Sequence, residues 1–157
     1  GLGIEKHLEK FIKENDDYSA IMLKVLADRL AEAATEYLHT IIRKEYWGYE
    51  NDQDLSIEEI IREKYHGIRP APGYPACPDH SEKKTLFSML NAEKHTGVSL
   101  TDSFSMYPAA SVSGYIFAHP DSQYFNVGRL QRDQMEDYSK RKGIPFQDIE
   151  KLLPMNY

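Results

Sequence analysis

A proline-rich segment has the residue types best suited to binding a small ligand. The run Arg69-Pro-Ala-Pro-Gly-Tyr-Pro-Ala-Cys-Pro78 holds four prolines in ten residues, which exclude a helix or a central strand. A loop stiffened in this way loses little entropy when it binds. Arg69 carries a planar fork that matches a carboxylate, and Gly73 permits a sharp turn that aims the Tyr74 ring outward. The pattern predicts a preformed slot for a ligand with a carboxylate and an apolar or cationic part. The alternative is a rigid connector whose arginine pairs with a local glutamate.

Cys77, Asp79 and His80 are the residues here that could bind a metal or form a nucleophile and base pair. Their spacing matches no zinc pattern, because a second Cys or His pair is missing. A Cys–His dyad would need its third partner from elsewhere in the chain. We therefore expect no metal ligand and no catalytic residue, and His80 is expected to make a local hydrogen bond or to face a ligand. A free-standing enzyme that uses a cysteine and a histidine is a further alternative.

Aromatic residues follow a predicted turn in the second half of the chain. His119-Pro-Asp-Ser122 predicts the turn, and Tyr124 and Phe125 come directly after it. Such rings could flank an adenine or a sulfonium, which is a cation that aromatic faces attract; ordinary strand packing is the alternative. Asp28 and Glu32 lie one turn apart on a predicted helix and, taken alone, indicate a solvated charged stripe. The sequence contains no glycine-rich phosphate loop and no serine nucleophile elbow.

The composition narrows the classes of partner. The net charge is −6, which disfavours nucleic acid and an anionic membrane as partners, since both attract Lys and Arg. No apolar run approaches the length of a transmembrane helix. Cys77 is the single cysteine, so no internal disulfide can form, and a reducing cytoplasm fits. The first residue is Gly rather than Met, which favours a processed or excised chain.

The elements that must position these residues can be predicted from periodicity and caps. Asp16 and Asp17 suit the N-terminus of a helix, as caps and as partners of its dipole. Apolar residues at helical spacing then predict one long helix from Tyr18 to about Trp47, with an apolar face central to the core, after a short helix at 4–13. A capping box at Ser56 and Glu59 predicts a helix to about Lys64. Asp79 is the expected N-cap of a helix that ends near His95, before Gly97.

The second half of the sequence predicts strands followed by helices. Alternating β-forming residues indicate an antiparallel pair at 101–106 and 110–119, and a third short strand at 124–127. Helices are expected at 130–142, which ends at Gly143, and at 145–152. Segregated helices and antiparallel strands indicate an α+β fold, with a long helix and several shorter ones packed on a small sheet.

Several ordered segments resemble a known family. The run Gly67–His80 closely resembles the signature of the activation domain of cobalamin-dependent methionine synthase. Further similar segments, in the same order, are Leu26–Ala33, Glu45–Tyr49, Glu93–Gly97, Ala110–Gly114, His119–Ser122 and Gln131–Gln134. The resemblance extends from about Asp16 to Leu153. It implies a domain that binds S-adenosylmethionine in a shallow groove.

The resemblance also implies roles for individual residues. Arg69 is similar to the arginine that engages the ligand carboxylate, and Tyr74 to a tyrosine close to the ligand that can face the cobalamin. Ala71 and its neighbours would offer backbone contacts. The ligand-binding residues expected in this way are Arg69, Ala71, Gly73, Tyr74, Tyr124, Phe125, Glu63, Glu32 and His80. Asp28 is similar to an acid that helps to stabilise the reactivation arrangement.

The family domain is about twice as long as this chain, so the resemblance implies that residues 1–157 are the C-terminal portion of a single activation domain. The N-terminal part of that domain would supply an Asp that holds the ligand's amino group. The implied function is support of the reductive methylation of cob(II)alamin to methylcobalamin in the cytoplasmic methyltransferase that makes methionine from homocysteine. Expected partners are the cobalamin-binding domain of the same enzyme and flavodoxin or a similar reductase. The alternative is a helical docking module for those partners without a small-molecule site.

Overall fold

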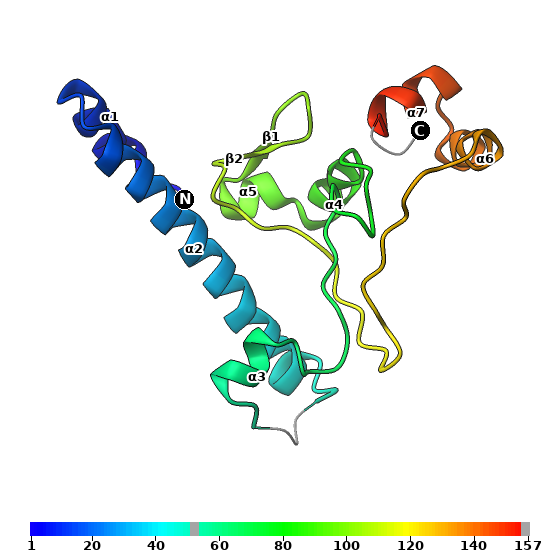
Figure 1. The fold of residues 1–157 in the computed structure, drawn as a ribbon, viewed down its shortest axis with the longest axis horizontal. Helices are drawn as coiled ribbons and strands as arrows, with labels where there is room; N and C mark the ends of the chain where they lie inside the picture. The colour runs from blue at the N-terminus through cyan, green and yellow to red at the C-terminus, as the bar shows by residue number, and fades with distance from the viewer. Residues whose placement is uncertain (51–53, 155–157) are drawn as a thin grey trace. The chain divides into compact units, whose positions relative to one another are not determined.

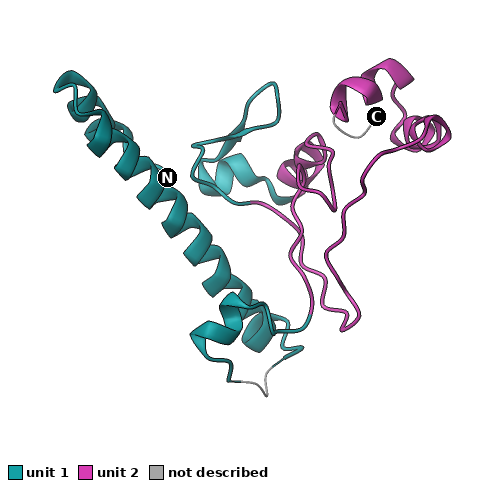
Figure 2. Cartoon of the chain, viewed as in Figure 1, with its two compact units in different colours: residues 1–66, 90–112 teal, residues 67–89, 113–157 magenta. Residues whose placement is uncertain are grey.

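The computed structural model describes residues 1–50 and 54–154, which form two compact units. Unit 1 comprises Gly1–His66 and Leu90–Val112, and unit 2 comprises Gly67–Met89 and Ser113–Tyr157 (Figure 2). The chain thus leaves unit 1 immediately before the proline-rich loop, and each unit contains segments from both halves of the sequence.

Unit 1 begins with two helices that pack against each other, α1 (Glu5–Lys13) and α2 (Asp17–Ile41) (Figure 1). The side chain of Asp16 caps α2 by accepting a hydrogen bond from the backbone N of Ser19 at 3.0 Å, which confirms the predicted acidic start. α2 continues into a π-helical turn, η1 (Ile42–Tyr46), in which the backbone N of Trp47 donates to the oxygen of Ile42. The predicted long helix is therefore confirmed, with a wider last turn.

The apolar face of α2 is exposed, so the prediction that it is central to the core is wrong for the described chain. Ile21 is 60% exposed and Leu30 is 71% exposed. The buried residues of the helix are Ala20, Ala27 and His39. The periodicity correctly indicated a helix with an apolar side, but among the described helices and strands it is α1 that packs on α2.

The rest of unit 1 contains α3 (Ile57–Ile61), α5 (Ala92–Thr96) and a two-stranded sheet. The capping box of Ser56 and Glu59 is present as predicted, although α3 ends before Lys64. The helix predicted to reach His95 is interrupted at Asn91, which has a left-handed φ of 48° and separates α4 (Glu82–Leu90) from α5. Gly97 ends α5 in the left-handed conformation, as predicted.

The strands lie elsewhere than predicted. β1 (Ser99–Leu100) pairs antiparallel with β2 (Met106–Tyr107), and the predicted strand at 101–106 is mostly the turn between them. The Thr101 hydroxyl accepts a hydrogen bond from the backbone N of Ser105 at 3.1 Å, and this local bond favours a turn. Residues 110–119 and 124–127 form no named strand. The α+β class, with helices and a small antiparallel sheet, is confirmed.

Unit 2 contains the start of α4, α6 (Arg132–Lys142) and α7 (Phe146–Leu152). Gly143 ends α6 in the left-handed conformation, which confirms the predicted stop. α6 and α7 pack around Met135, Ile149 and Leu153, which form the buried core of this unit. No helix in residues 1–50 and 54–154 is both long enough and apolar enough to cross a membrane.

Candidate functional site

The proline-rich loop of unit 2 forms a tight turn at the position that the sequence predicted. Gly73 has a φ of 97°, and its backbone N donates to the oxygen of Cys77 at 2.7 Å. The backbone N of Cys77 donates in return to the oxygen of Tyr74 at 2.8 Å. Pro72 is fully buried in front of the turn. The loop is therefore anchored by its own backbone, and it presents Tyr74 at the turn.

A second extended segment of unit 2 supports the start of this loop. Ile68 and Phe117 exchange two backbone hydrogen bonds of 3.0 and 2.9 Å, and the backbone N of Tyr115 donates to Pro70 at 2.9 Å. The two backbones approach closely, because a Cβ on Gly67 would lie 2.2 Å from the oxygen of Phe117. Glycine at position 67 is thus required both by this approach and by a φ of 85°. The support thus holds the backbone on both sides of Arg69.

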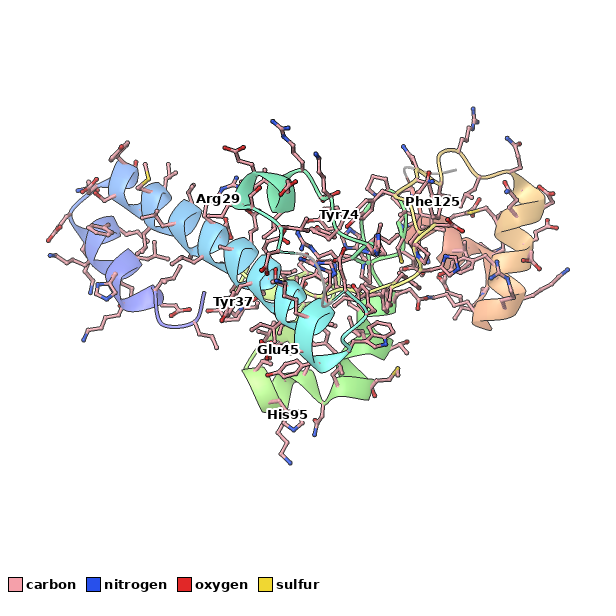
Figure 3. The ribbon with its side chains drawn as sticks, turned by 90° about the horizontal axis from the view of Figure 1, so that it is seen from below. Arg29, Tyr37, Glu45, Tyr74, His95 and Phe125 are labelled. Carbon is pink, nitrogen blue, oxygen red and sulfur yellow. The ribbon has the colours of Figure 1, made fainter. Side chains whose placement is uncertain are left out.

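Tyr124 is joined to the loop by a direct hydrogen bond. Its phenol oxygen accepts from the backbone N of Arg69 at 3.0 Å. The rings remain available to solvent, with exposed fractions of 66% for Tyr74, 47% for Tyr124 and 61% for Phe125. Figure 3 labels Tyr74 and Phe125, which come from different segments of unit 2. Unit 2 therefore combines a guanidinium with three exposed aromatic rings, a chemistry suited to a carboxylate and to a flat or cationic group.

His80 supports the loop from behind. A Cβ on Gly73 would lie 2.1 Å from the His80 ring, so the imidazole packs against the bare backbone of the turn. Nδ1 of His80 lies 2.7 Å from Nζ of Lys83, and because an ammonium only donates, Nδ1 is the acceptor. Burial, followed by the nearby Lys83 charge, lowers the pKa of His80. Of the two expected roles, the structure gives His80 the local hydrogen bond.

Asp79 belongs to a buried ionic network rather than to a helix cap, which corrects its predicted role. Its Oδ1 accepts from the backbone N of Ser81 at 2.7 Å, but α4 begins only at Glu82. Its Oδ2 accepts from the Tyr138 hydroxyl at 2.7 Å and pairs with Nζ of Lys142 at 2.8 Å. Burial raises the pKa of Asp79, but the hydrogen bonds from Lys142, Tyr138 and Ser81 outweigh it and leave that pKa below its ordinary value. The carboxylate thus ties the loop end to α6.

A cleft of about 600 Å³ opens beside this network, within unit 2. Its lining residues are Cys77, Pro78, Asp79, Glu82, Val127, Leu130, Asp133, Gln134, Asp137, Tyr138, Arg141 and Leu153. Burial, followed by the charges of Glu82 and Asp79, raises the pKa of the Cys77 thiol, so little thiolate is present at neutral pH. This argues against a cysteine nucleophile. Within the described part of the chain, no group of three His, Cys, Asp or Glu residues could hold a metal ion.

The acidic residues expected near the ligand lie in unit 1. Glu32 pairs with Nη1 of Arg29 at 2.6 Å on the exposed side of α2, where Figure 3 labels Arg29. This pair agrees with the interpretation of Asp28 and Glu32 as part of a solvated, charged side of the helix. Glu63 is exposed and follows α3 with a left-handed φ of 52°. Because the other expected residues lie in unit 2, the contribution of Glu32 and Glu63 to the same site stays a prediction.

One cluster was missed by the sequence reasoning. Arg43 and Glu50 form an ion pair in which both side chains are almost fully buried. His39 and Tyr65 contact the same guanidinium. The available signal was the spacing of His39 and Arg43, which four residues apart share one face of a helix. Glu50 and Tyr65 had no such signal, because the fold brings them to this face.

The structure is an α+β domain in which the turn at Gly73 carries Tyr74, while Arg69 precedes the turn and Tyr124 and Phe125 come from a second segment of the same unit. Comparison with protein families matches residues 1–143 to the vitamin B12 dependent methionine synthase activation domain. The chain belongs to this family. It is also similar to a MetH reactivation domain whose crystal structure is described as bound to AdoHcy. The sequence identity is 56% and the TM-score is 0.96.

The two chains differ in extent. The match covers 99% of this chain but 48% of the solved one, so this chain spans about half the length of that relative. The family resemblance read from the segment Gly67–His80 is thereby confirmed, as is the fold class.

Proposed function

We propose that this chain binds S-adenosylmethionine at the proline-rich loop and thereby supports the reductive methylation of cobalamin in methionine synthase. The observation that carries the proposal is the 56% identity, over 99% of the chain, to a domain crystallised with AdoHcy. AdoHcy shares the adenosyl group and the amino-acid tail of S-adenosylmethionine and lacks the transferred methyl group. A site that holds one of them offers most of the contacts needed for the other.

The geometry of unit 2 supports specific roles for its residues. The Arg69 guanidinium binds the ligand carboxylate, and backbone groups from Ala71 to Gly73 bind the adenosyl end. The exposed rings of Tyr74, Tyr124 and Phe125 flank the adenine and the sulfonium. His80 packs behind Gly73 and keeps the turn in shape. From unit 1, Glu32 and Glu63 supply negative charge for the cationic groups of the ligand.

No protein acid or base is needed for the proposed methyl transfer. A sulfonium is already a good leaving group, and the reduced cobalamin, held by another domain of the enzyme, supplies the nucleophile. The chain contributes position and alignment, which convert a bimolecular step into an effectively unimolecular one. The electron comes from flavodoxin or a similar reductase. The released product is AdoHcy, the ligand of the solved relative.

A calorimetric titration with AdoHcy and with S-adenosylmethionine, in a domain restored to the full length of the solved relative, tests the proposal. We expect Arg69→Ala to weaken both affinities about tenfold or more, because it removes a charge-assisted hydrogen bond. Arg69→Lys should retain part of the affinity, since it keeps the charge but loses the planar fork. Arg129→Ala, at an exposed arginine of the same unit, is the matched control and should bind as the parent does. Equal binding by Arg69→Ala would show that the guanidinium has no such role.

A docking module is the second candidate, and the exposed face of α2 favours it. Leu30 and Ile21 are more than half exposed, and charged residues such as Arg29 and Glu32 lie on the same helix. In this case the chain binds the cobalamin or reductase domains and has no ligand of its own. Binding to those domains that is unchanged by Arg69→Ala, together with no heat of AdoHcy binding, would favour this candidate.

A further inference from the structure

Four side chains of unit 2, here called the Asp79 network, join the end of the proline-rich loop to α6: Asp79, Glu82, Tyr138 and Lys142. Asp79 is 4% exposed, and its Oδ2 accepts from the Tyr138 hydroxyl at 2.7 Å and pairs with Nζ of Lys142 at 2.8 Å. Lys142 also pairs with Glu82, whose Oε1 lies 3.2 Å from the Tyr138 hydroxyl. The network therefore connects the loop end and the start of α4 to one face of α6.

The core of unit 2 holds α6 in place. Met135 of α6 and Ile149 of α7 are fully buried, and the Tyr138 ring packs against this core. Tyr138 and Lys142 are four residues apart and so share one side of the helix, with Nζ 3.4 Å from the hydroxyl. The two groups that bind Asp79 are thus fixed to the best-packed part of the unit.

Asp79 lies between the two residues that contact the turn at Gly73. The oxygen of Cys77 accepts from the backbone N of Gly73 at 2.7 Å. On the other side of Asp79 in the sequence, the His80 ring lies 2.1 Å from where a Cβ on Gly73 would be, and Nζ of Lys83 donates to this ring at 2.7 Å. Fixing Asp79 therefore restrains both contacts on the turn.

A carboxylate buried to this extent is a costly way to stabilise a fold, because its charge is removed from water. Apolar residues of similar size often serve stability as well or better. The network offers direction in addition to stability. Asp79 uses both of its carboxylate oxygens, since Oδ1 accepts from the backbone N of Ser81 and Oδ2 is bound by α6. Its side chain is therefore held in one orientation.

We propose that Tyr138 and Lys142 are positioning residues for the adenosyl half of the ligand, acting through Asp79 on the turn at Gly73. This inference rests on the proposed function, in which backbone groups from Ala71 to Gly73 bind the adenosyl end. It gives α6, which contains none of the expected ligand-binding residues, control over the affinity of the loop. A turn that is held in its binding conformation beforehand loses less entropy when the ligand arrives.

The test uses two ligands that share the adenosyl half. AdoHcy carries the amino-acid tail, whereas 5′-methylthioadenosine has a methyl group in its place. Both are titrated by calorimetry into the full-length domain used to test the proposed function. Tyr138→Phe keeps the ring in the core and removes the hydroxyl, and we expect it to lower both affinities by the same factor, about threefold. Arg69→Ala should instead weaken AdoHcy selectively, because only AdoHcy has a carboxylate.

A double variant tests the whole network. Asp79→Asn/Lys142→Met removes both charges together, so that neither is left buried alone. The bond from the backbone N of Val127 to the oxygen of Pro75 does not involve these side chains and still ties the loop to unit 2. We expect both affinities to fall about tenfold in this variant. Lys142→Arg, which keeps the cation, should stay within about twofold of the parent.

Two controls separate positioning from loss of stability. Ile149→Val removes a methyl group from the core of the same unit and should leave both affinities unchanged. Circular dichroism and urea titration establish that each variant is folded at the temperature of calorimetry. Adding Tyr138→Phe to the double variant should cause no further loss, because the hydroxyl acts through Asp79. Losses that multiply would show that Tyr138 acts by another route and would overturn the proposal.

The remaining outcomes are equally decisive. Unchanged affinities in folded Tyr138→Phe and in the folded double variant would reduce the network to a structural role. A loss confined to AdoHcy would contradict the assignment to the adenosyl half. Should the double variant fail to fold, Tyr138→Phe decides alone, since it leaves the ion pairs of Lys142 in place. Absence of AdoHcy binding in the parent domain would instead refute the proposed function.

Discussion

The phenol oxygen of Tyr124 accepts a hydrogen bond from the backbone N of Arg69, 55 residues earlier in the chain, at 3.0 Å. The hydroxyl is therefore engaged in holding the loop, while the ring remains 47% exposed. Tyr124 is expected to contact the ligand with its ring, and its hydroxyl also fixes the backbone of Arg69.

Replacing Tyr124 by Phe separates the role of the ring from that of the hydroxyl, because it keeps the ring and removes the hydroxyl. The lost bond is exposed, so we expect the free energy of unfolding in urea to fall by less than about 1 kcal/mol. We expect AdoHcy affinity, measured by calorimetry, to fall about threefold to tenfold, because the loop becomes less ordered before binding. Tyr37→Phe, which removes a phenol hydroxyl from an exposed residue of α2, is the matched control and should change neither value by much. Unchanged affinity in Tyr124→Phe would show that the hydroxyl does not prepare the loop.

A side chain at Gly67 should be costly. An added Cβ would lie 2.2 Å from the backbone oxygen of Phe117, and its φ of 85° is unfavourable for other residues. We expect Gly67→Ala to lower the free energy of unfolding by about 3 kcal/mol or more, from urea titrations. Gly128→Ala is the control, because Gly128 also has a positive φ of 66° but nothing lies within 4 Å of its added Cβ. It should cost about 1 kcal/mol, and similar losses in both variants would mean that the two segments are not in close contact.

The Asp79 network predicts a loss of stability in acid. The pKa of Asp79 is below its ordinary value, so its contribution is fully present above the unfolded pKa of about 3.9 and is lost as pH falls through the folded value. Asp79→Asn should cost about 3 kcal/mol at neutral pH, because it removes the buried carboxylate and leaves the partly buried Lys142 with Glu82 alone. It should also flatten the dependence of unfolding free energy on pH below about 5. Asp133→Asn, at an exposed acid of the same cleft, should retain the parent's dependence.

The same network predicts a loss of stability at high pH. Burial is the first cause that raises the pKa of Tyr138, and its hydrogen bond to Asp79 adds to it. Burial works against the charge of Lys142, but hydrogen bonds to Asp79 and Glu82 outweigh it and raise that pKa. Tyr138 and Lys142 therefore contribute fully to the free energy of unfolding below their unfolded pKa of about 10. These contributions are lost as pH rises toward the pKa values of the folded state. Urea titrations above about pH 10 should therefore show a steeper fall for the parent than for Tyr138→Phe.

Cys77 should be a slow nucleophile in the folded chain. Its raised pKa and its partly buried position both reduce attack on iodoacetamide at neutral pH. We expect alkylation, followed by mass spectrometry, to be roughly fivefold slower or more than in concentrated guanidinium. Equal alkylation rates in buffer and in guanidinium would instead favour the interpretation of the chain as a cysteine enzyme.

Local chemistry made the ends of several elements predictable. Asp16 caps α2, Ser56 and Glu59 form a capping box, and Gly97 and Gly143 end their helices, because each of these interactions joins residues close in sequence. The strands were misplaced because alternation at 101–106 could not reveal that the Thr101 hydroxyl would close a turn.

Burial was harder to predict than secondary structure. An apolar stripe on a helix shows which side would be buried, but it does not show whether another element lies against that side, as the exposure of Leu30 illustrates. The turn at Gly73 was predictable from proline and glycine alone. The burial of Glu50 was not predictable, because its partners Arg43 and His66 reach it only after η1 and the segment after α3 have folded together.

The wide turn η1 makes the end of α2 sensitive to deletions. In an α-helix each residue advances the chain by about 100° around the axis. The bond from Trp47 back to Ile42 accommodates one residue more than an α-helical turn would. Losing a single residue there would rotate everything that follows by about a quarter of a circle relative to α2. Glu50 would then miss Arg43, so a one-residue deletion in η1 should be more damaging than replacing most of its side chains.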